Sequence, residues 1–166
     1  MGVRIRKLST KDLEYRVELL NTSSISNVLN VSETFNIETT QRWFQKTRTR
    51  DDRYDVVIMD DSNVVGMAGL VNISQMNKNA EAYIYVDPAF QGKRYGSKGL
   101  KLLLDHAFHE LKLNKVFLYT FAENTRANSF YEKLGFMREG CLKEHTFHKG
   151  VLKDRCIYSV LKSDWE

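Results

Sequence analysis

Apolar and polar positions in the first third of the chain predict one strand and two helices. Residues 3–7 alternate as a short strand does, and Leu13, Val17 and Leu20 then recur at helical spacing. Ser9 or Thr10 can cap this first helix. The polar stretch that follows is rich in Ser and Asn, which predicts a loop or a broken helix, and a second helix with a basic end follows it. The last two segments cover residues 21–36 and 38–49.

From Tyr54 onward the pattern changes to short strands separated by turns and helices. Strands are predicted at residues 54–59, 64–73, 80–86 and 115–121, and a final hairpin at 140–147 and 151–161. Two helices interrupt them, at residues 97–111 and 125–134, and Gly135 is placed to end the second. Helices and strands that alternate in this way predict one α/β domain over residues 1–166, built on a mixed, largely antiparallel sheet.

Composition and charge exclude several classes of protein. The 166 residues suit one domain, and 42% hydrophobic with 28% charged residues is too apolar for a disordered chain. No apolar run reaches the ~20 residues of a membrane span, and the start lacks a signal peptide, so we expect a cytoplasmic protein without a membrane partner. The net charge of +4 suits an anionic ligand, and no nucleic-acid-binding motif is present.

Neither cysteine nor histidine is arranged as a metal site. Cys141 and Cys156 lack metal-ligand spacing; they could face each other across the last hairpin, but we expect free, buried thiols in a reducing compartment. His106 and His109 have no third ligand nearby, so no metal is expected. His145 and His148 flank a turn, which predicts surface positions.

The stretch at residues 83–108 carries the first chemical signal. A strand passes through a polar, glycine-bearing turn directly into an apolar-faced helix. Backbone N–H groups of such a turn and of the helix start can hold a phosphate, and Gly92 and Gly96 allow the main chain to approach it closely. Lys93, Arg94 and Lys98 add positive charge. Taken alone, an ordinary strand-to-helix connection explains the stretch equally well.

The second signal lies at residues 121–136, where a strand ends, Asn124 follows, and a short helix carries Asn128 and Tyr131. Both stretches, in this order, resemble the GNAT superfamily of N-acetyltransferases. Residues 91–96 match the pattern Q/R-x-x-G-x-G/A, and the later stretch matches N-x-x-A-x-x-x-Y-x-x-x-G-F. The tail from Gly135 is similar to the branch that holds ribosomal-protein N-terminal, spermidine and amino-sugar acetyltransferases. The resemblance implies the GNAT fold, with about seven strands and about four flanking helices.

One residue departs from the family pattern, because Arg94 stands where the family has its central glycine. The turn must therefore be one that a residue with a side chain can adopt. Arg94 could compensate by giving its guanidinium to a phosphate oxygen. The alternative is a weakened cofactor site, and we expect binding to be intact.

The resemblance implies acetyl-CoA as the cosubstrate. Its diphosphate would lie over the turn, its pantetheine arm would run beside the strand that ends at Val86, and Asn124 would bond that arm. The residues implied in binding it are Val86, Gln91, Gly92, Lys93, Arg94, Tyr95, Gly96, Ser97, Asn124 and Asn128.

The same resemblance implies direct attack of the amine on the thioester, with Tyr131 as the acid that protonates the CoA thiolate. A phenol with a pKa near 10 is a workable donor at close range. The general base is less determined. Glu81 shares one strand face with Tyr83 and Tyr85 and is the first candidate. Glu144, Glu33 and a chain of water molecules remain alternatives.

The acceptor is left open among a protein N-terminus, a polyamine and an amino sugar. A polyamine site would need several converging carboxylates, and a peptide would need an open groove between the first helices and the last hairpin. Trp43 and Phe44 could line an acceptor pocket, but such a pair more often lies in the core. A non-catalytic module that binds CoA or another anion is the alternative outside the enzymes. Members of this fold commonly dimerise, so a homodimer is a further expectation.

Overall fold

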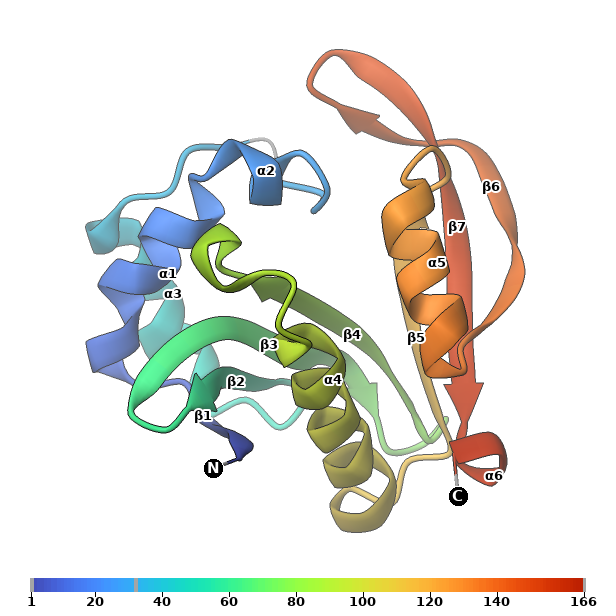
Figure 1. The fold of residues 1–166 in the computed structure, drawn as a ribbon, viewed down its shortest axis with the longest axis horizontal. Coiled ribbons are helices and arrows are strands. Elements are labelled where there is room, and N and C mark those ends of the chain that lie inside the picture. Colours follow the sequence, from blue (N-terminus) through green and yellow to red (C-terminus); the bar gives the residue numbers. More distant parts are fainter. Residues whose placement is uncertain (1, 32, 166) are drawn as a thin grey trace.

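A single mixed sheet runs through the whole molecule (Figure 1). The computed structural model describes residues 2–31 and 33–165. Its seven strands follow the order β1-β2-β3-β4-β5-β7-β6. They are β1 (Val3–Lys7), β2 (Tyr54–Asp60), β3 (Asn63–Ser74), β4 (Asn79–Val86), β5 (Lys115–Phe121), β6 (Met137–His148) and β7 (Val151–Leu161). This confirms the predicted α/β fold, including the number of strands.

All neighbouring strands are antiparallel except β4 and β5, which run parallel in the middle of the sheet. Their pairing covers only Asn79–Glu81 on β4 and Lys115–Phe117 on β5. Beyond these residues the two strands diverge, as the ribbon shows (Figure 1). The sheet is therefore two antiparallel halves that are joined at one end and open at the other.

Helices cover the two faces of the sheet. The faces are separated by strand alternation, since Tyr83 and Tyr85 of β4 pack on one side while Ala82 and Ile84 pack on the other. The first side is covered by α1 (Leu13–Leu20), α2 (Ser23–Ser26) and α3 (Ile37–Thr47), and the second by α4 (Tyr95–Asp105) and α5 (Thr125–Leu134), with α6 (Lys162–Trp165) at the end of the chain.

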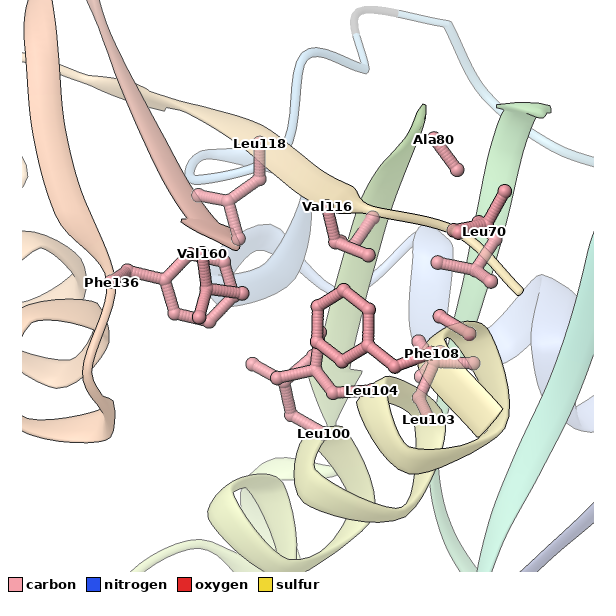
Figure 2. Packing of buried hydrophobic residues seen from close by; sticks show 14 of the residues in the cluster. Leu70, Ala80, Leu100, Leu103, Leu104, Phe108, Val116, Leu118, Phe136 and Val160 are labelled. Atoms are coloured by element: carbon pink, nitrogen blue, oxygen red, sulfur yellow. The ribbon is translucent and has the colours of Figure 1, made fainter. Parts of the chain in front are cut away.

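The larger core lies under α4, whose apolar positions face the sheet. Figure 2 shows Leu100, Leu103, Leu104 and Phe108 meeting the strand residues around Val116. All five are fully buried, and each such side chain contributes ~1.5–3 kcal/mol by leaving water. The predicted helix continues past Asp105 as a π-helical turn, His106–Glu110, which keeps Phe108 in the core.

Gly99 lets α4 approach the sheet closely. A Cβ atom built on it would lie 2.6 Å from Cδ1 of Ile58 on β2, a distance that real Cβ atoms do not show. The helix axis is thereby held near the sheet, and this fixes the height of the helix start above the open ends of β4 and β5. Packing in the core thus positions the segment that carries the first motif.

Four side chains either differ from their predicted environment or decide between predicted alternatives. His148 is buried with 4% of its surface exposed, because its ring packs 4.9 Å from that of Phe121; the predicted surface position was wrong. Cys141 and Cys156 do face each other across the hairpin, as free thiols with their sulfurs 2.7 Å apart, but only Cys156 is buried. Phe44 is buried in the smaller core.

Candidate active site

A cavity of about 1170 Å³ lies where β4 and β5 diverge. Its walls come from the open edges of these strands, from the turn before α4 and the start of that helix, and from one face of α5. The mouth on the other side of the sheet is lined by α2 and its following loop and by residues of the β6–β7 hairpin. A chamber between two strand edges exposes backbone groups that no neighbouring strand satisfies.

The turn between β4 and α4 is built from a short 3-10 helix and two left-handed residues. Asp87 caps the 3-10 helix by accepting a hydrogen bond from the Ala89 amide. Gly92 has φ +81°, where a side chain would be strained, and Arg94 has φ +63° directly before the first residue of α4. The Tyr95 hydroxyl donates to Asp60 at 2.5 Å and ties the turn to β2.

Arg94 thus shows why its position favours glycine. The backbone there is left-handed, which a residue with a Cβ adopts at a cost of ~1–2 kcal/mol. The helix start is nevertheless formed, since Ser97 Oγ donates to the Arg94 carbonyl at 3.0 Å and the Lys98 amide does so at 3.1 Å. A left-handed turn and a formed helix start are thus both present with arginine at this position.

The amides of residues 92–97 have no hydrogen-bond acceptor among the residues that the structure describes. The last of them belong to the first turn of α4, whose N–H groups lack partners in any helix. Unpaired amides and the positive end of the helix dipole favour an anion at this place. Arg94, Arg126 and Lys133 line the same cavity and add positive charge.

Most residues expected to bind the cosubstrate lie together around this end of the cavity. Those that line it are Val86, Gln91, Gly92, Arg94, Tyr95, Gly96, Ser97 and Asn124. Lys93 is exposed and does not line it. Asn128 does not line it either: its Oδ1 accepts from Thr120 at 2.5 Å and its Nδ2 donates to the Ala122 carbonyl at 3.2 Å. Asn128 therefore ties α5 to β5.

Asn124 has two roles available. Its Oδ1 accepts a hydrogen bond from the Ala127 amide at 3.1 Å and so caps α5. Its Nδ2 group has no partner in the described part of the chain, and the residue lines the cavity. The cap fixes the side chain while a donor remains for a ligand.

Tyr131 lies on the face of α5 that borders the cavity. Its ring packs edge-on against Phe130 and Phe136, at 5.1 and 5.6 Å between centroids. The hydroxyl makes no hydrogen bond within residues 2–31 and 33–165. Burial raises the pKa of this phenol well above its ordinary value, so it is protonated at neutral pH.

Glu81 lines the cavity where β4 and β5 separate. Burial raises the pKa of its carboxyl group, and the positive charge of Arg155 partly offsets this. The two alternatives lie elsewhere, since neither Glu33 nor Glu144 lines the cavity and both are exposed. The only carboxylate in the described cavity wall is that of Glu81.

Several cavity residues were not found from the sequence. Arg126, Phe130 and Lys133 are spaced four and three residues apart on α5, so that helical periodicity could have placed them beside Tyr131. Leu29, Tyr119, His145 and Arg155 come from four separate segments and share no local pattern.

Among residues 2–31 and 33–165, no three His, Cys, Asp or Glu side chains are grouped as a metal site would need. No helix in that part of the chain is long and apolar enough to cross a bilayer. His106 stacks on Tyr54 with ring centroids 4.2 Å apart, and Trp43 packs beneath the guanidinium of Arg16.

Comparison with known proteins gives one consistent result. The sequence model described as the acetyltransferase (GNAT) domain matches residues 3–137. A spermidine N(1)-acetyltransferase of Escherichia coli is 31% identical over 162 residues, which cover 95% of this chain and 86% of that protein. YdaF of Bacillus subtilis, a ribosomal N-acetyltransferase by its provisional name, is 31% identical over 109 residues, 66% of this chain and 60% of its own length.

Solved structures agree. The spermidine N-acetyltransferase of Vibrio cholerae, crystallised in complex with CoA and spermine, superposes with a TM-score of 0.94 at 27% identity. The match covers 98% of this chain and 97% of that one. A chimera of the same Vibrio enzyme gives a TM-score of 0.90 at 25% identity.

Proposed function

This chain belongs to the GNAT acetyltransferase family and transfers an acetyl group from acetyl-CoA to an amine, and on that basis we propose that the acceptor is a small-molecule primary amine. The observation that supports this is a contact across the mouth of the cavity. Lys149, at the tip of the β6–β7 hairpin, donates to Ser26 Oγ at 3.3 Å and to Asn27 Oδ1. This contact joins the segment after α2 to the last hairpin, the two elements between which an extended peptide acceptor would have to lie.

In this proposal the cosubstrate lies along the turn and the open edge of β4. The amides of residues 92–97 hold the diphosphate, with Arg94, Arg126 and Lys133 as counter-charges. The pantetheine arm pairs with the edge of β4 beyond Glu81, where β5 has moved away. Asn124 donates its free Nδ2 to that arm. The proposed binding mode is supported by hydrogen-bond donors that have no partner in the described part of the protein, namely the amides of residues 92–97 and Asn124 Nδ2.

Glu81 and Tyr131 would handle the two protons of the reaction. Glu81 accepts a proton from the acceptor amine, directly or through water, and the amine nitrogen bonds to the thioester carbon. The tetrahedral intermediate collapses as the C–S bond breaks, and Tyr131 protonates the departing thiolate. Burial raises the pKa of Tyr131, and the same apolar surroundings raise the pKa of the CoA thiol, so the pKa values of the proton donor and of the leaving group shift in the same direction.

A polyamine is a second candidate for the acceptor, and the comparisons favour it. Relatives from Escherichia coli and Vibrio cholerae, whose matches cover 95% and 69% of this chain, are named spermidine N-acetyltransferases, and one structural neighbour was crystallised with spermine. The cavity itself offers a single carboxylate in its described wall, whereas a polyamine carries several positive charges. Kinetics with acceptors of different charge distinguish a polyamine from other small amines.

A panel of acceptors with thiol release as the signal tests the proposal. Spermidine, glucosamine, lysine and short peptides with a free N-terminus are compared by kcat/KM. We expect small amines to exceed every peptide, because the Lys149 contact closes the groove. Lys149→Ala should raise turnover of peptides relative to small amines. A peptide preferred by the unaltered protein would contradict the proposal, and no turnover with any amine would favour a CoA-binding module.

We also propose a homodimer. Support comes from β6, which is one of the two edge strands of the sheet and exposes Met137 and Phe147 at 70% and 68% of their surface. Long exposed strand edges are usually covered by another chain or protected. Sedimentation equilibrium at micromolar concentration would give a mass near 38.8 kDa, twice the 19.4 kDa of one chain.

A further inference from the structure

We propose that the acceptor amine also carries an anionic group, a carboxylate or a phosphate, and that Arg155 binds it. This inference rests on the proposed small-molecule acceptor. It concerns the acceptor end of the cavity, by which we mean the part lined by Leu29, Glu81, Tyr119, His145 and Arg155. Arg155 would thus determine which amines the enzyme accepts.

The side chain of Arg155 is held in place from several sides. It lies on β7 opposite Phe121, and its guanidinium carbon is 4.8 Å from the centre of the Phe121 ring and 5.5 Å from that of Tyr119. Nη1 donates to Thr146 Oγ1 at 3.2 Å. Arginine packed on aromatic faces loses little freedom on binding a ligand, so this group is preorganised.

Yet Arg155 lacks the partner that a half-buried cation needs. Its Nε is buried and has no hydrogen-bond partner in the part of the chain that the structure describes. No described carboxylate lies within 4.0 Å of it, although five other ion pairs are formed within that distance. Glu81 acts on this charge from a longer distance, but no carboxylate pairs with it directly. Burying a charge without a direct partner is costly, and such groups commonly mark a binding site.

Charge at the acceptor end also opposes a polycation. Glu81 is the one carboxylate there, and Arg155 supplies the opposite sign. Like charges at close range near a protein surface repel each other. A spermidine molecule with one amine at Glu81 would bring its remaining ammonium groups toward Arg155. An amine with an anionic group instead matches both side chains, one at each end.

The test uses acceptors that differ in charge at a fixed shape. Pentylamine, 5-aminopentanoate and 1,5-diaminopentane share one chain length and carry a neutral, anionic or cationic far end. Glucosamine and glucosamine 6-phosphate form the phosphate pair. We expect the unaltered enzyme to prefer the anionic member by at least tenfold in kcat/KM. Whichever of the carboxylate and phosphate arms shows the larger preference identifies the group.

Arg155→Gln should lower kcat/KM at least tenfold for the anionic acceptors and less than threefold for the neutral ones. Arg155→Lys keeps the charge without the planar fork and should restore part of the preference. Lys143→Gln is the matched control, because it removes an exposed positive charge from the same hairpin outside the cavity wall. It should leave all the ratios unchanged.

Three outcomes would overturn the inference. One is a preference of the unaltered enzyme for 1,5-diaminopentane or spermidine, and the second is equal use of the charged and neutral members. In the third, Arg155→Gln lowers turnover of all acceptors alike and shifts the acid limb of the pH profile, so that Arg155 serves only to set the ionisation of Glu81. If Arg155→Gln does not fold, the preference of the unaltered enzyme and Arg155→Lys still decide. Failure of the proposed function looks different, since small amines would then not be turned over or peptides would be preferred.

Discussion

Tyr131 combines a closely packed ring with a hydroxyl that has no partner in the described protein. Tyr131→Phe should therefore leave the fold, the melting temperature and the affinity for acetyl-CoA nearly unchanged. Turnover should fall by roughly 10²–10⁴, the contribution typical of a general acid. Steady-state kinetics and calorimetry with CoA measure the two effects separately. Unaltered kcat would remove Tyr131 from the proton transfer and leave it a packing residue.

Glu81 predicts the acid limb of the pH profile. Burial raises the pKa of its carboxyl group, and only the ionised form accepts a proton. kcat/KM should therefore fall with decreasing pH at values above the ~4.3 of an ordinary glutamate, and Glu81→Gln should lower the rate and abolish this limb. A limb that survives in Glu81→Gln would point to another base.

The contribution of Glu81 to stability should decrease with rising pH, whereas its contribution to activity should increase. A raised pKa means that the folded protein binds this proton more readily than the unfolded chain does. Stability associated with protonated Glu81 is present at low pH and is lost as the pH rises through the folded pKa. Glu81→Gln should thus be at least as stable as the unaltered protein at pH 7, by thermal unfolding. A lower melting temperature would show that the carboxylate has a structural role.

Two substitutions of Arg94 separate the effect of its left-handed backbone on stability from the effect of its guanidinium on cofactor binding. Arg94→Gly relieves the left-handed backbone and should stabilise the fold by about 1 kcal/mol, which raises Tm by roughly 2–4 °C for a chain of this size. Arg94→Ala keeps the strain. Both lose the guanidinium and should raise KM for acetyl-CoA to a similar extent. Equal melting temperatures in the two variants would contradict the assignment of strain to this residue.

Residue types and local spacing sufficed for most of the candidate site. The motifs pointed to Asn124 and to residues 91–97, and all of these except Lys93 line the cavity, as Glu81 does. Asn128 shows what a motif cannot predict. It matches the pattern, but its side-chain amide forms hydrogen bonds with Thr120 and with the Ala122 carbonyl instead of facing the cavity. Whether the lining residues bind the cosubstrate stays a prediction.

Helices and strands were predicted where their pattern is local. The helix at α4 was expected from residue 97 and begins at Tyr95, and its end at Glu110 is π-helical rather than α-helical. The polar segment at residues 21–36 contains the short helix α2, which is too short and too polar to show a helical spacing of apolar residues. The first and last residues of a helix or strand depend on caps and tertiary contacts, so they are harder to predict from the sequence than its central residues.

Within α4, two glycines should behave differently on substitution. A Cβ at Gly99 would lie 2.6 Å from Ile58 and force the helix away from the sheet, whereas one at Gly96 meets Val86 at an ordinary 3.4 Å. Gly99→Ala should cost ~1–3 kcal/mol by overpacking. Gly96→Ala should fold normally and raise KM for acetyl-CoA, because that position lines the cavity. Thermal unfolding and initial rates of both variants make the comparison, and a destabilised Gly96→Ala with a stable Gly99→Ala would refute it.

The β6–β7 hairpin illustrates what local patterns could not give. Arg155 reaches the cavity because β7 pairs with β5, a partner more than thirty residues earlier in the chain. His148 is buried because of its contact with Phe121, at the end of that same strand. Both consequences follow from the order of strands in the sheet, which alternation within one strand does not specify.

At the scale of the molecule, the cavity exists because the central strand pair is short. Asn79–Glu81 and Lys115–Phe117 hold the two halves of the sheet together, and the remainder of β4 is paired only with β3. The sequence predicted both strands and their neighbours along the chain. It could not predict where their pairing stops, because separation of the strands depends on the helices packed against each half.

An open strand edge should respond measurably to a ligand that pairs with it. In the free protein, amides of residues 82–86 that point away from β3 lack a protein partner and should exchange rapidly with deuterium. Acetyl-CoA at about 100 times Kd should slow them and stabilise the fold by ~2.7 kcal/mol, which raises Tm by roughly 5–10 °C. The compound 3′,5′-ADP provides the control, because it carries phosphates but no pantetheine arm, and it should protect only residues 92–97. Residues 66–70 of β3 lie between two strands and should be unaffected by either ligand. Exchange at residues 82–86 that is the same with and without saturating acetyl-CoA would show that the arm does not lie along β4, and Asn124 and Glu81 would then have to be assigned anew.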